Sequence, residues 1–141
     1  MKKTYSLQSA ASKAAIFILL AVLVIAISAS AEPESGDVTV AVGDVQAVSV
    51  DGSSRLLRKG DKVSVGTTVK TGKDSRAVVV ITPRSAIRIS ESSEVLIEVV
   101  NQDVQPIDVT INLKDGSLGA LLKPNAMDEL DFKVRTPSGV A

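Results

Sequence analysis

The sequence predicts an all-β domain, and three observations support this prediction. Short runs of valine, isoleucine and leucine recur along the chain after residue 35, and most of them end at a turn rich in glycine, proline or aspartate. Several runs alternate apolar and polar residues, which is typical of strands with one buried face. No segment in this region keeps the apolar period of an amphipathic helix. We therefore expect a β-solenoid-like or sandwich-like domain of short strands that follows an N-terminal signal peptide.

Residues 1–31 have the pattern of a secretory signal peptide. Lysines and no acidic residue precede an uninterrupted apolar run over 14–27, and Ala29 and Ala31 form a small-residue cleavage site before Glu32. The apolar run has the length of a signal segment and is short for a membrane span. We predict export to the periplasm or the cell exterior with cleavage after Ala31. An uncleaved N-terminal anchor is the alternative.

Residues 32–35 form a polar linker, and the β domain is expected over 36–141. The segments with strand patterns are 38–42, 45–50, 62–65, 77–81, 86–89, 95–100, 107–113, 118–122 and 130–134. The segment 107–113 alternates most strictly. The segment 77–81 is continuously apolar and β-branched, so we expect it to be buried on both faces. Asp51-Gly52 is the clearest hairpin turn, because both residues accept a positive φ.

The expected core is almost entirely aliphatic, since Phe132 is the only aromatic residue after the signal segment. Small sandwiches commonly place large aromatic residues in the core. Stacked coils of a solenoid need similar aliphatic residues in successive layers. The composition therefore favours a solenoid over a sandwich.

Basic and acidic residues are concentrated in different parts of the chain. Basic residues predominate over 55–88 and acidic residues over 91–131. Neighbouring strands could pair these charges across the fold. Alternatively, the basic residues could form a positive face that binds an anionic polymer or lipid headgroups. The residues of this possible anionic-partner face are Arg55, Arg58, Lys59, Lys62, Lys70, Lys73, Arg76, Arg84 and Arg88.

The composition excludes several chemistries. The chain has no cysteine and no histidine, which excludes disulfides, thiol catalysis and a Ser-His-Asp triad. Lys70-Thr71-Gly72 matches one element of penicillin-binding enzymes, but the accompanying motifs are missing from the mature chain, so it is interpreted as a strand that ends in a turn. We predict no catalytic residue, no cofactor site and no metal site.

Two carboxylate pairs leave a second function class open. Glu91 with Glu94, and Asp128 with Glu129, could perform acid–base chemistry if they faced a cleft. The alternative function is therefore a carboxylate-dependent envelope hydrolase or an ion-binding protein. Both pairs lie in polar turn or loop sequence, which favours a solvated surface.

A series of short elements resembles one known family. The elements are Gly43-Asp44-Val45, Leu57-Arg58-Lys59-Gly60-Asp61, Val65-Gly66, Val69-Lys70-Thr71-Gly72, Ser75-Arg76-Ala77-Val78-Val79, Ser93-Glu94-Val95-Leu96-Ile97, Leu113-Lys114-Asp115-Gly116-Ser117-Leu118 and Phe132-Lys133-Val134-Arg135-Thr136-Pro137-Ser138-Gly139-Val140-Ala141. In order and spacing they resemble the FecR-type domain, the extracytoplasmic domain of iron-siderophore signalling regulators and of many exported proteins. The resemblance covers nearly all of 36–141. Thr82-Pro83-Arg84-Ser85 departs from the family, which usually has an Asp-Gly-Ser turn here.

The resemblance implies a non-catalytic, exported interaction or signalling module that docks an envelope protein or a cell-wall polymer. Nucleic acid is not an expected partner, and contact with the membrane is expected only during export or through an uncleaved anchor. Only a short segment precedes the apolar run, so we do not expect direct sigma-factor binding. In the family, the element at Thr136-Pro137 leads into further strands. We therefore expect the 36–141 domain to be incomplete at its C-terminus, with the edge over 130–134 completed by more chain, a partner strand or a second copy.

Overall fold

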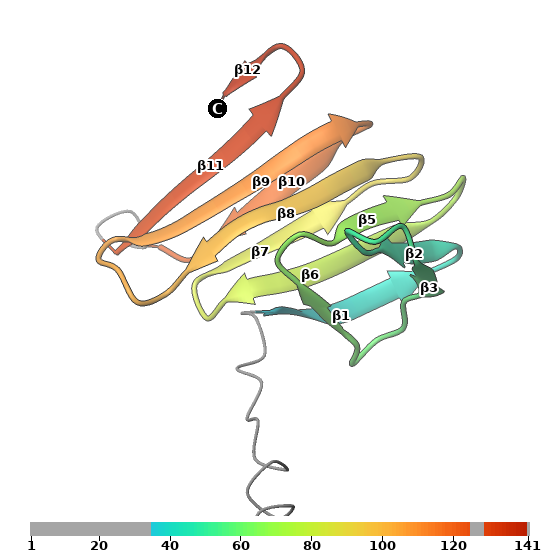
Figure 1. The fold of residues 1–141 in the computed structure, drawn as a ribbon, viewed down its shortest axis with the longest axis horizontal. Helices are drawn as coiled ribbons and strands as arrows, with labels where there is room; N and C mark the ends of the chain where they lie inside the picture. Colours follow the sequence, from blue (N-terminus) through green and yellow to red (C-terminus); the bar gives the residue numbers. More distant parts are fainter. Residues whose placement is uncertain (1–34, 125–128, 141) are drawn as a thin grey trace, which may run out of the picture. The chain divides into compact units, whose positions relative to one another are not determined.

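The computed structural model describes residues 35–124 and 129–140, and all regular structure in these residues is β-strand (Figure 1). The all-β prediction is therefore confirmed. The signal segment, with Ala29, Ala31 and Glu32, lies outside the described residues, so its cleavage stays a prediction. The described part of the chain contains no helix with the length and hydrophobicity of a membrane span.

The strands form two sheets. In spatial order, the five-stranded sheet consists of β10 (Leu118–Leu122), β7 (Ser85–Ile89), β6 (Arg76–Thr82), β1 (Ser35–Val42) and β4 (Lys62–Ser64). The seven-stranded sheet consists of β12 (Gly139–Val140), β11 (Leu130–Thr136), β9 (Ile107–Asp115), β8 (Glu94–Asn101), β5 (Thr68–Thr71), β2 (Val45–Val48) and β3 (Ser54–Leu56). Within the described residues, neighbouring strands pair antiparallel except β9 and β11, which are parallel.

One aliphatic core joins the inner faces of the two sheets. Val79 and Ile87 of the five-stranded sheet and Val95, Ile97 and Ile111 of the seven-stranded sheet belong to it, and all five side chains are completely buried. Their neighbours in sequence point outward, because successive side chains of a strand lie on opposite faces. The period-2 pattern of the sequence therefore specifies which side of each strand is buried.

Four corners connect the two sheets at one end of the molecule. At each corner a residue with positive φ precedes a serine or an aspartate; the pairs are Gly43-Asp44, Asp74-Ser75, Ser92-Ser93 and Gly116-Ser117. The strands that meet at these corners are β1 and β2, β5 and β6, β7 and β8, and β9 and β10. The two sheets have these strands in matching order, so the corners stack in the order of the sequence.

Buried serine side chains bind one corner to the next. The amide of Asp44 donates to Ser75 Oγ at 2.8 Å, and the amide of Ser117 donates to Ser93 Oγ at 3.0 Å. These bonds leave no room for a side chain on Gly43 or Gly116: a Cβ there would lie 2.4 Å from Ser75 Oγ and 2.2 Å from Ser93 Oγ. Glycine is thus required at these two corners both by sterics and by φ.

The structure is a sandwich and not a solenoid, although the two alternatives share one feature here. The chain advances along the stack of corners in sequence order, as it would in a solenoid. It reverses direction, however, through the β6–β7 and β8–β9 hairpins, so neighbouring strands are antiparallel.

The expected strands all form, with some corrections. The 77–81 segment is not buried on both faces, because Val78 and Val80 lie on the outer face of β6 and are only half-buried. The sequence of the strand does not show whether another part of the chain covers this outer face, and here none of the described residues does. The short strands β3 and β12 were not predicted. Pairing of β12 with Arg135 and Thr136 leaves residues 130–134 without a partner on that edge among the described residues.

Candidate interaction site

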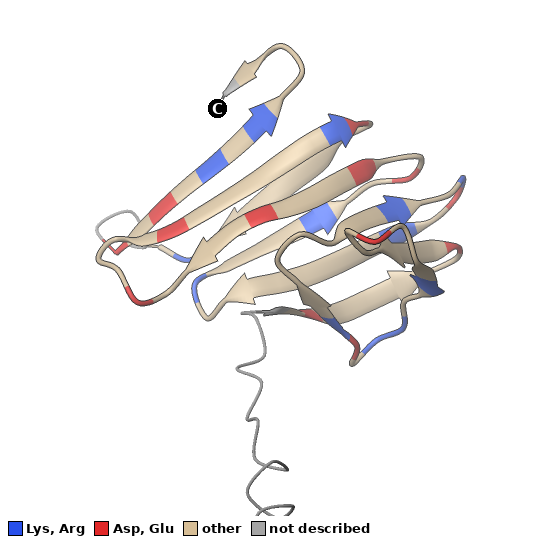
Figure 2. Ribbon diagram, viewed as in Figure 1, with Lys and Arg blue, Asp and Glu red and all other residues tan. Residues whose placement is uncertain are grey.

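The basic residues expected to form one face are distributed over several surfaces (Figure 2). A first group lies around the loop from β3 to β4. Arg55 contacts Asp61 at 3.3 Å, Lys62 contacts Asp37 at 2.9 Å, and Arg58 and Lys59 lie in the same loop. This group is therefore partly neutralised by nearby aspartates.

Two further basic residues pair with acidic residues from the second half of the chain. Lys70 Nζ lies 3.5 Å from Glu94 Oε2 on neighbouring strands, and Arg84 lies 2.7 Å from Glu129. These contacts agree with the prediction that the basic and acidic parts pair across the fold. They are half-exposed, so each contributes only about 0–1 kcal/mol to stability.

Arg76 and Arg88 remain on the outer face of the five-stranded sheet. Within the described residues, neither has a carboxylate within 4.0 Å, and the same holds for Lys73 at the adjacent corner. Arg76 and Arg88 line an open hollow of about 350 Å³, and two carboxylates share it with them; the other lining residues are Asp74, Ser75, Ser90 and Glu91. Within the described residues, five residues of the predicted basic face have no carboxylate within 4.0 Å, and they are Arg58, Lys59, Lys73, Arg76 and Arg88.

Glu91 and Glu94, the carboxylate pair that lies wholly within the described residues, make separate contacts. Glu91 Oε2 accepts the amide of Asp74 at a corner, whereas Glu94 contacts Lys70 and Lys114 on the outer face of the seven-stranded sheet. Glu129 is bound to Arg84, and Asp128 lies outside the described residues. The described residues contain no group of three or more acidic side chains placed to hold a metal ion. The hydrolase and ion-binding alternative gains no support from this geometry.

Lys70-Thr71-Gly72 lies at the end of β5, as the sequence suggested. Thr71 Oγ1 donates to the carbonyl of Ser90 at 2.6 Å and accepts the amide of Ser93 at 3.0 Å. Thr71 is buried, and its hydroxyl connects the end of β5 to the neighbouring corner at Ser93.

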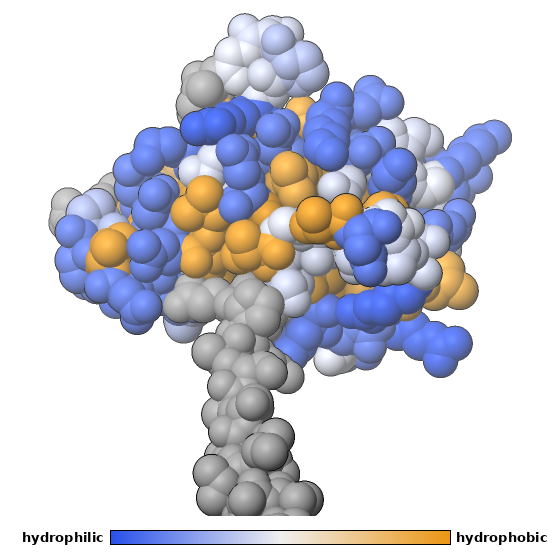
Figure 3. Space-filling model, viewed as in Figure 1, coloured by the Kyte–Doolittle hydropathy of each residue, from blue (hydrophilic) through white to orange (hydrophobic). Residues whose placement is uncertain are grey.

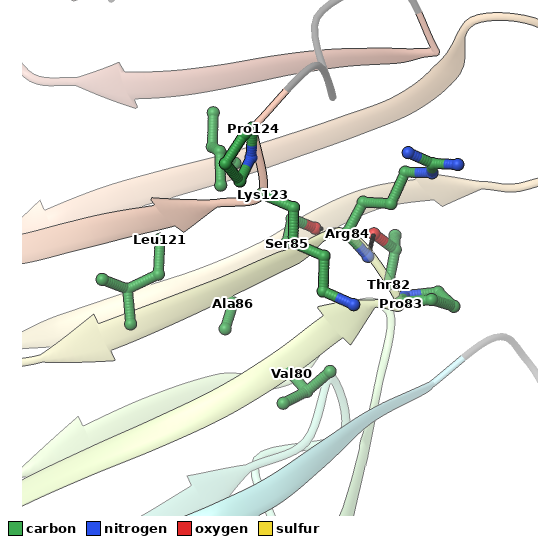
Figure 4. Close-up of a pocket in the computed structure, with 10 residues that line it drawn as sticks. Val80, Thr82, Pro83, Arg84, Ser85, Ala86, Leu121, Lys123 and Pro124 are labelled. Carbon is green, nitrogen blue, oxygen red and sulfur yellow. Dashed lines mark hydrogen bonds between the residues drawn. The ribbon is translucent and has the colours of Figure 1, made fainter.

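An apolar hollow lies at the β6–β7 turn, where the sequence departs from the family pattern. Its volume is about 350 Å³, and Thr82, Pro83 and Arg84 form one wall. Val80, Ala86 and Leu121 lie side by side on three neighbouring strands and form its floor, while Arg84 extends away from them (Figure 4). This hollow could not be predicted from the sequence, because it depends on the pairing of β10 with β7.

Hydrophobic residues also reach the molecular surface. In Figure 3 they form a central band between hydrophilic margins. Leu121 on β10 is 54% exposed and Val42 on β1 is 43% exposed, and both lie on the five-stranded sheet. These two residues do not adjoin, because β7 and β6 lie between β10 and β1, and single exposed apolar residues are normal on a protein surface.

The comparison with protein families gives one match. The family described as "FecR protein" matches residues 67–141, which is more than half of the chain. The matched range begins just before β5, so the elements that carry the resemblance over 43–66 lie outside it. Neither the curated proteins nor the solved structures include a match. On the strength of the family match, this chain belongs to the FecR protein family.

Proposed function

We propose that this protein is a non-catalytic, exported module that docks another protein of the cell envelope and takes part in signalling. Family membership carries the proposal, because FecR proteins suggest a signalling or regulatory role and are typically associated with the envelope. The signal-peptide pattern over 1–31 supports export. A cell-wall polymer is the other partner that the family resemblance allows.

The charge arrangement supports a partner with an anionic group. Arg55 of β3, Lys62 of β4 and Lys70 of β5 pair with carboxylates, whereas Arg76 and Arg88 have no such partner within the described residues. Both arginines project from the outer face of one sheet beside a hollow. An interaction through exposed charges of this kind weakens as salt rises.

Chemical crosslinking in intact cells, followed by purification of the tagged full chain, tests this function. We expect one envelope protein in stoichiometric amount, and we expect its purified form to bind more weakly when Arg76 and Arg88 are both changed to glutamine. The matched control changes Arg55 and Lys62 to glutamine, which removes the same charge from another surface. Turnover of an envelope substrate that is lost in Glu94→Gln would overturn the proposal, as would specific capture of cell-wall polymer without any protein.

A further inference from the structure

The two sheets end at different strands on one side of the sandwich. The five-stranded sheet ends at β10, whereas the seven-stranded sheet continues beyond β9 with β11 and β12. Gly116 and Ser117 join β9 directly to β10, so these two strands face each other across the core. Within the described residues, no strand of the five-stranded sheet lies opposite β11. The sandwich is one strand short at this corner, and β11 is seen at the margin of the molecule in Figure 1.

Side chains that face inward at this corner are incompletely covered, although Phe132 packs against the core. Ala120 of β10 pairs with the fully buried Ile87, so it points to the inner side of the sheet, yet it is exposed. On β11, Phe132 and Val134 pair in register with the fully buried Val109 and Ile111, yet both are only half-buried. We use the word slot for the position beside β10 and opposite β11 that a further strand of the five-stranded sheet would occupy.

The free edge of β10 carries no charge that would repel another strand. Its sequence is Leu118-Gly119-Ala120-Leu121-Leu122, and its outer edge has no partner strand in the described part of the chain. The edge strands β3 and β4 each carry a cation, Arg55 and Lys62. Charged side chains at sheet edges are a common protection against strand pairing. The edge of β10 lacks this protection.

The outer side of the same edge indicates the chemistry of an added strand. Gly119 pairs with Arg88, and no atom lies within 4 Å of the position that a Cβ on Gly119 would occupy. A residue placed opposite Gly119 on an added strand would lie two strand spacings, roughly 10 Å, from Arg88. The long side chains of arginine and glutamate can meet across this distance, because glycine puts no side chain between them. An acidic residue at that position would pair with Arg88.

A second copy of the chain does not fit this edge. Antiparallel pairing of two β10 strands about a two-fold axis keeps both inner faces on the same side. The partner's β9 would then occupy the space in which β11 of the first copy lies. The slot therefore accepts only a single strand. A strand that is covered by a second sheet, as β10 is by β9, would overlap with β11.

We propose that the edge of β10 is a docking site for one extended segment of a partner protein. The segment adds to the five-stranded sheet, places alternate apolar side chains against Ala120, Phe132 and Val134, and places an acidic side chain opposite Gly119. This inference rests on the proposed function, because it names the form and chemistry of the partner segment. Main-chain hydrogen bonds to the edge supply affinity in this mode of recognition, and the alternating pockets supply specificity.

Binding of two labelled heptapeptides to the full chain tests the site by fluorescence anisotropy. In the first, four valines alternate with threonine, glutamate and threonine; the second has the same composition with the valines consecutive. We expect saturable binding of the first and at least about tenfold weaker binding of the second, because only alternation presents the valines on one face. Equal binding of the two peptides, or no binding of the first, would overturn the proposal.

Two variants locate the peptide on the structure. Ala120→Lys places a charge in the slot at an exposed position and is expected to weaken binding at least about tenfold, whereas Leu56→Lys on the edge of β3 leaves it unchanged. Arg88→Glu is expected to weaken binding of the glutamate peptide and to favour a peptide with lysine in its place. Binding that Ala120→Lys does not alter contradicts the site, and binding that Arg88→Glu does not alter contradicts the acidic residue.

The same variants separate this inference from the proposed function. An envelope partner that binds the wild type and Ala120→Lys equally well would leave the function standing and overturn the docking site. The opposite result is also informative. If the peptide binds in a way that requires Ala120 but crosslinking finds no envelope partner, the docking site is supported and the proposed function is not.

Discussion

At the scale of single residues, the corners of the sandwich depend on two kinds of residue. Glycine is required where a neighbouring serine hydroxyl occupies the space of a Cβ, as at Gly43 and Gly116. Ser92, with φ of 48°, shows that a side chain is tolerated at an equivalent corner. The hydroxyl of the serine that follows then accepts a hydrogen bond from a backbone amide of the adjacent corner, as Ser93 Oγ does from the amide of Ser117.

The requirement for glycine at 116 can be measured against a glycine with similar φ in open space. Gly116→Ala should lower the free energy of unfolding by about 2–4 kcal/mol, since the left-handed conformation and the clash with Ser93 both contribute. Gly52, with φ of 84°, has no atom within 4 Å of a Cβ, so Gly52→Ala should cost only about 1 kcal/mol. Urea unfolding compares the two, and equal losses would mean that the clash with Ser93 is relieved without cost.

The β2–β3 turn should make a pH-dependent contribution to stability. The hydroxyl and the amide of Ser53 donate to Asp51 Oδ1 at 2.6 Å and 2.9 Å, and these bonds lower the pKa of Asp51 from its ordinary value of 3.8. A carboxyl group with a lowered pKa stabilises the fold at pH values above 3.8 and loses this contribution as the pH falls through the pKa of the folded state.

Thermal melts of Asp51→Asn and the wild type should therefore differ most near neutral pH and converge in strongly acidic solution. Ser53→Ala removes the hydroxyl donor, which is the larger cause of the lowered pKa. In the Ser53→Ala background, the effect of Asp51→Asn should vary less with pH. A difference that stays constant down to strongly acidic solution would show that the turn does not depend on the charge of Asp51.

At the scale of strands, ion pairs between neighbours connect the basic and acidic parts of the sequence. Lys70 of β5 and Glu94 of β8 lie directly opposite each other on the outer face, and Lys114 of β9 also approaches Glu94 at 3.9 Å. Such exposed pairs add little to stability but disfavour other registers, because a register shift would place a charge against the core.

A double-mutant cycle on Lys70 and Glu94 should give a favourable coupling of about 0.2–1 kcal/mol at low salt. Lys70→Gln and Glu94→Gln alone and together provide the cycle, with Lys114 kept. The coupling should decrease as salt is added, because both side chains are half-exposed. A coupling of zero at low salt would show that the pair is not formed in solution.

At the scale of the whole molecule, the two sheets share one core and should unfold together. Ile97→Ala in the seven-stranded sheet and Ile87→Ala in the five-stranded sheet each remove a fully buried side chain, and each should cost about 2–5 kcal/mol. Leu96→Ala, on the outer face beside Ile97, is the matched control and should cost less.

Amide hydrogen exchange can show whether the sheets are coupled. Each of the two core variants should reduce protection in both sheets by a similar factor, because either cavity weakens the common core. Reduced protection confined to the mutated sheet would contradict a single cooperative unit.

The sequence by itself determined the all-β class, the family and the position of most strands. These follow from local patterns: the alternation over 107–113 fixes which side chains face inward, and Asp51-Gly52 fixes a turn through its backbone preferences. The short strands β3 and β12 were missed, since two or three residues carry too little pattern.

Only the tertiary structure decided which strands share a sheet. The sheet order in turn decides which charged and apolar side chains lie together on each surface. The sequence pattern of a strand is the same in a sandwich and in a solenoid. Alternation shows which side chains are buried, but it does not show which strand lies next to this one. Hairpins and corners distribute the basic residues over several surfaces, so that Lys70 meets Glu94 while Arg88 lies beside Gly119. The open corner beside β10 arises because the two sheets end at different strands, and such a mismatch exists only between layers that packing has brought together.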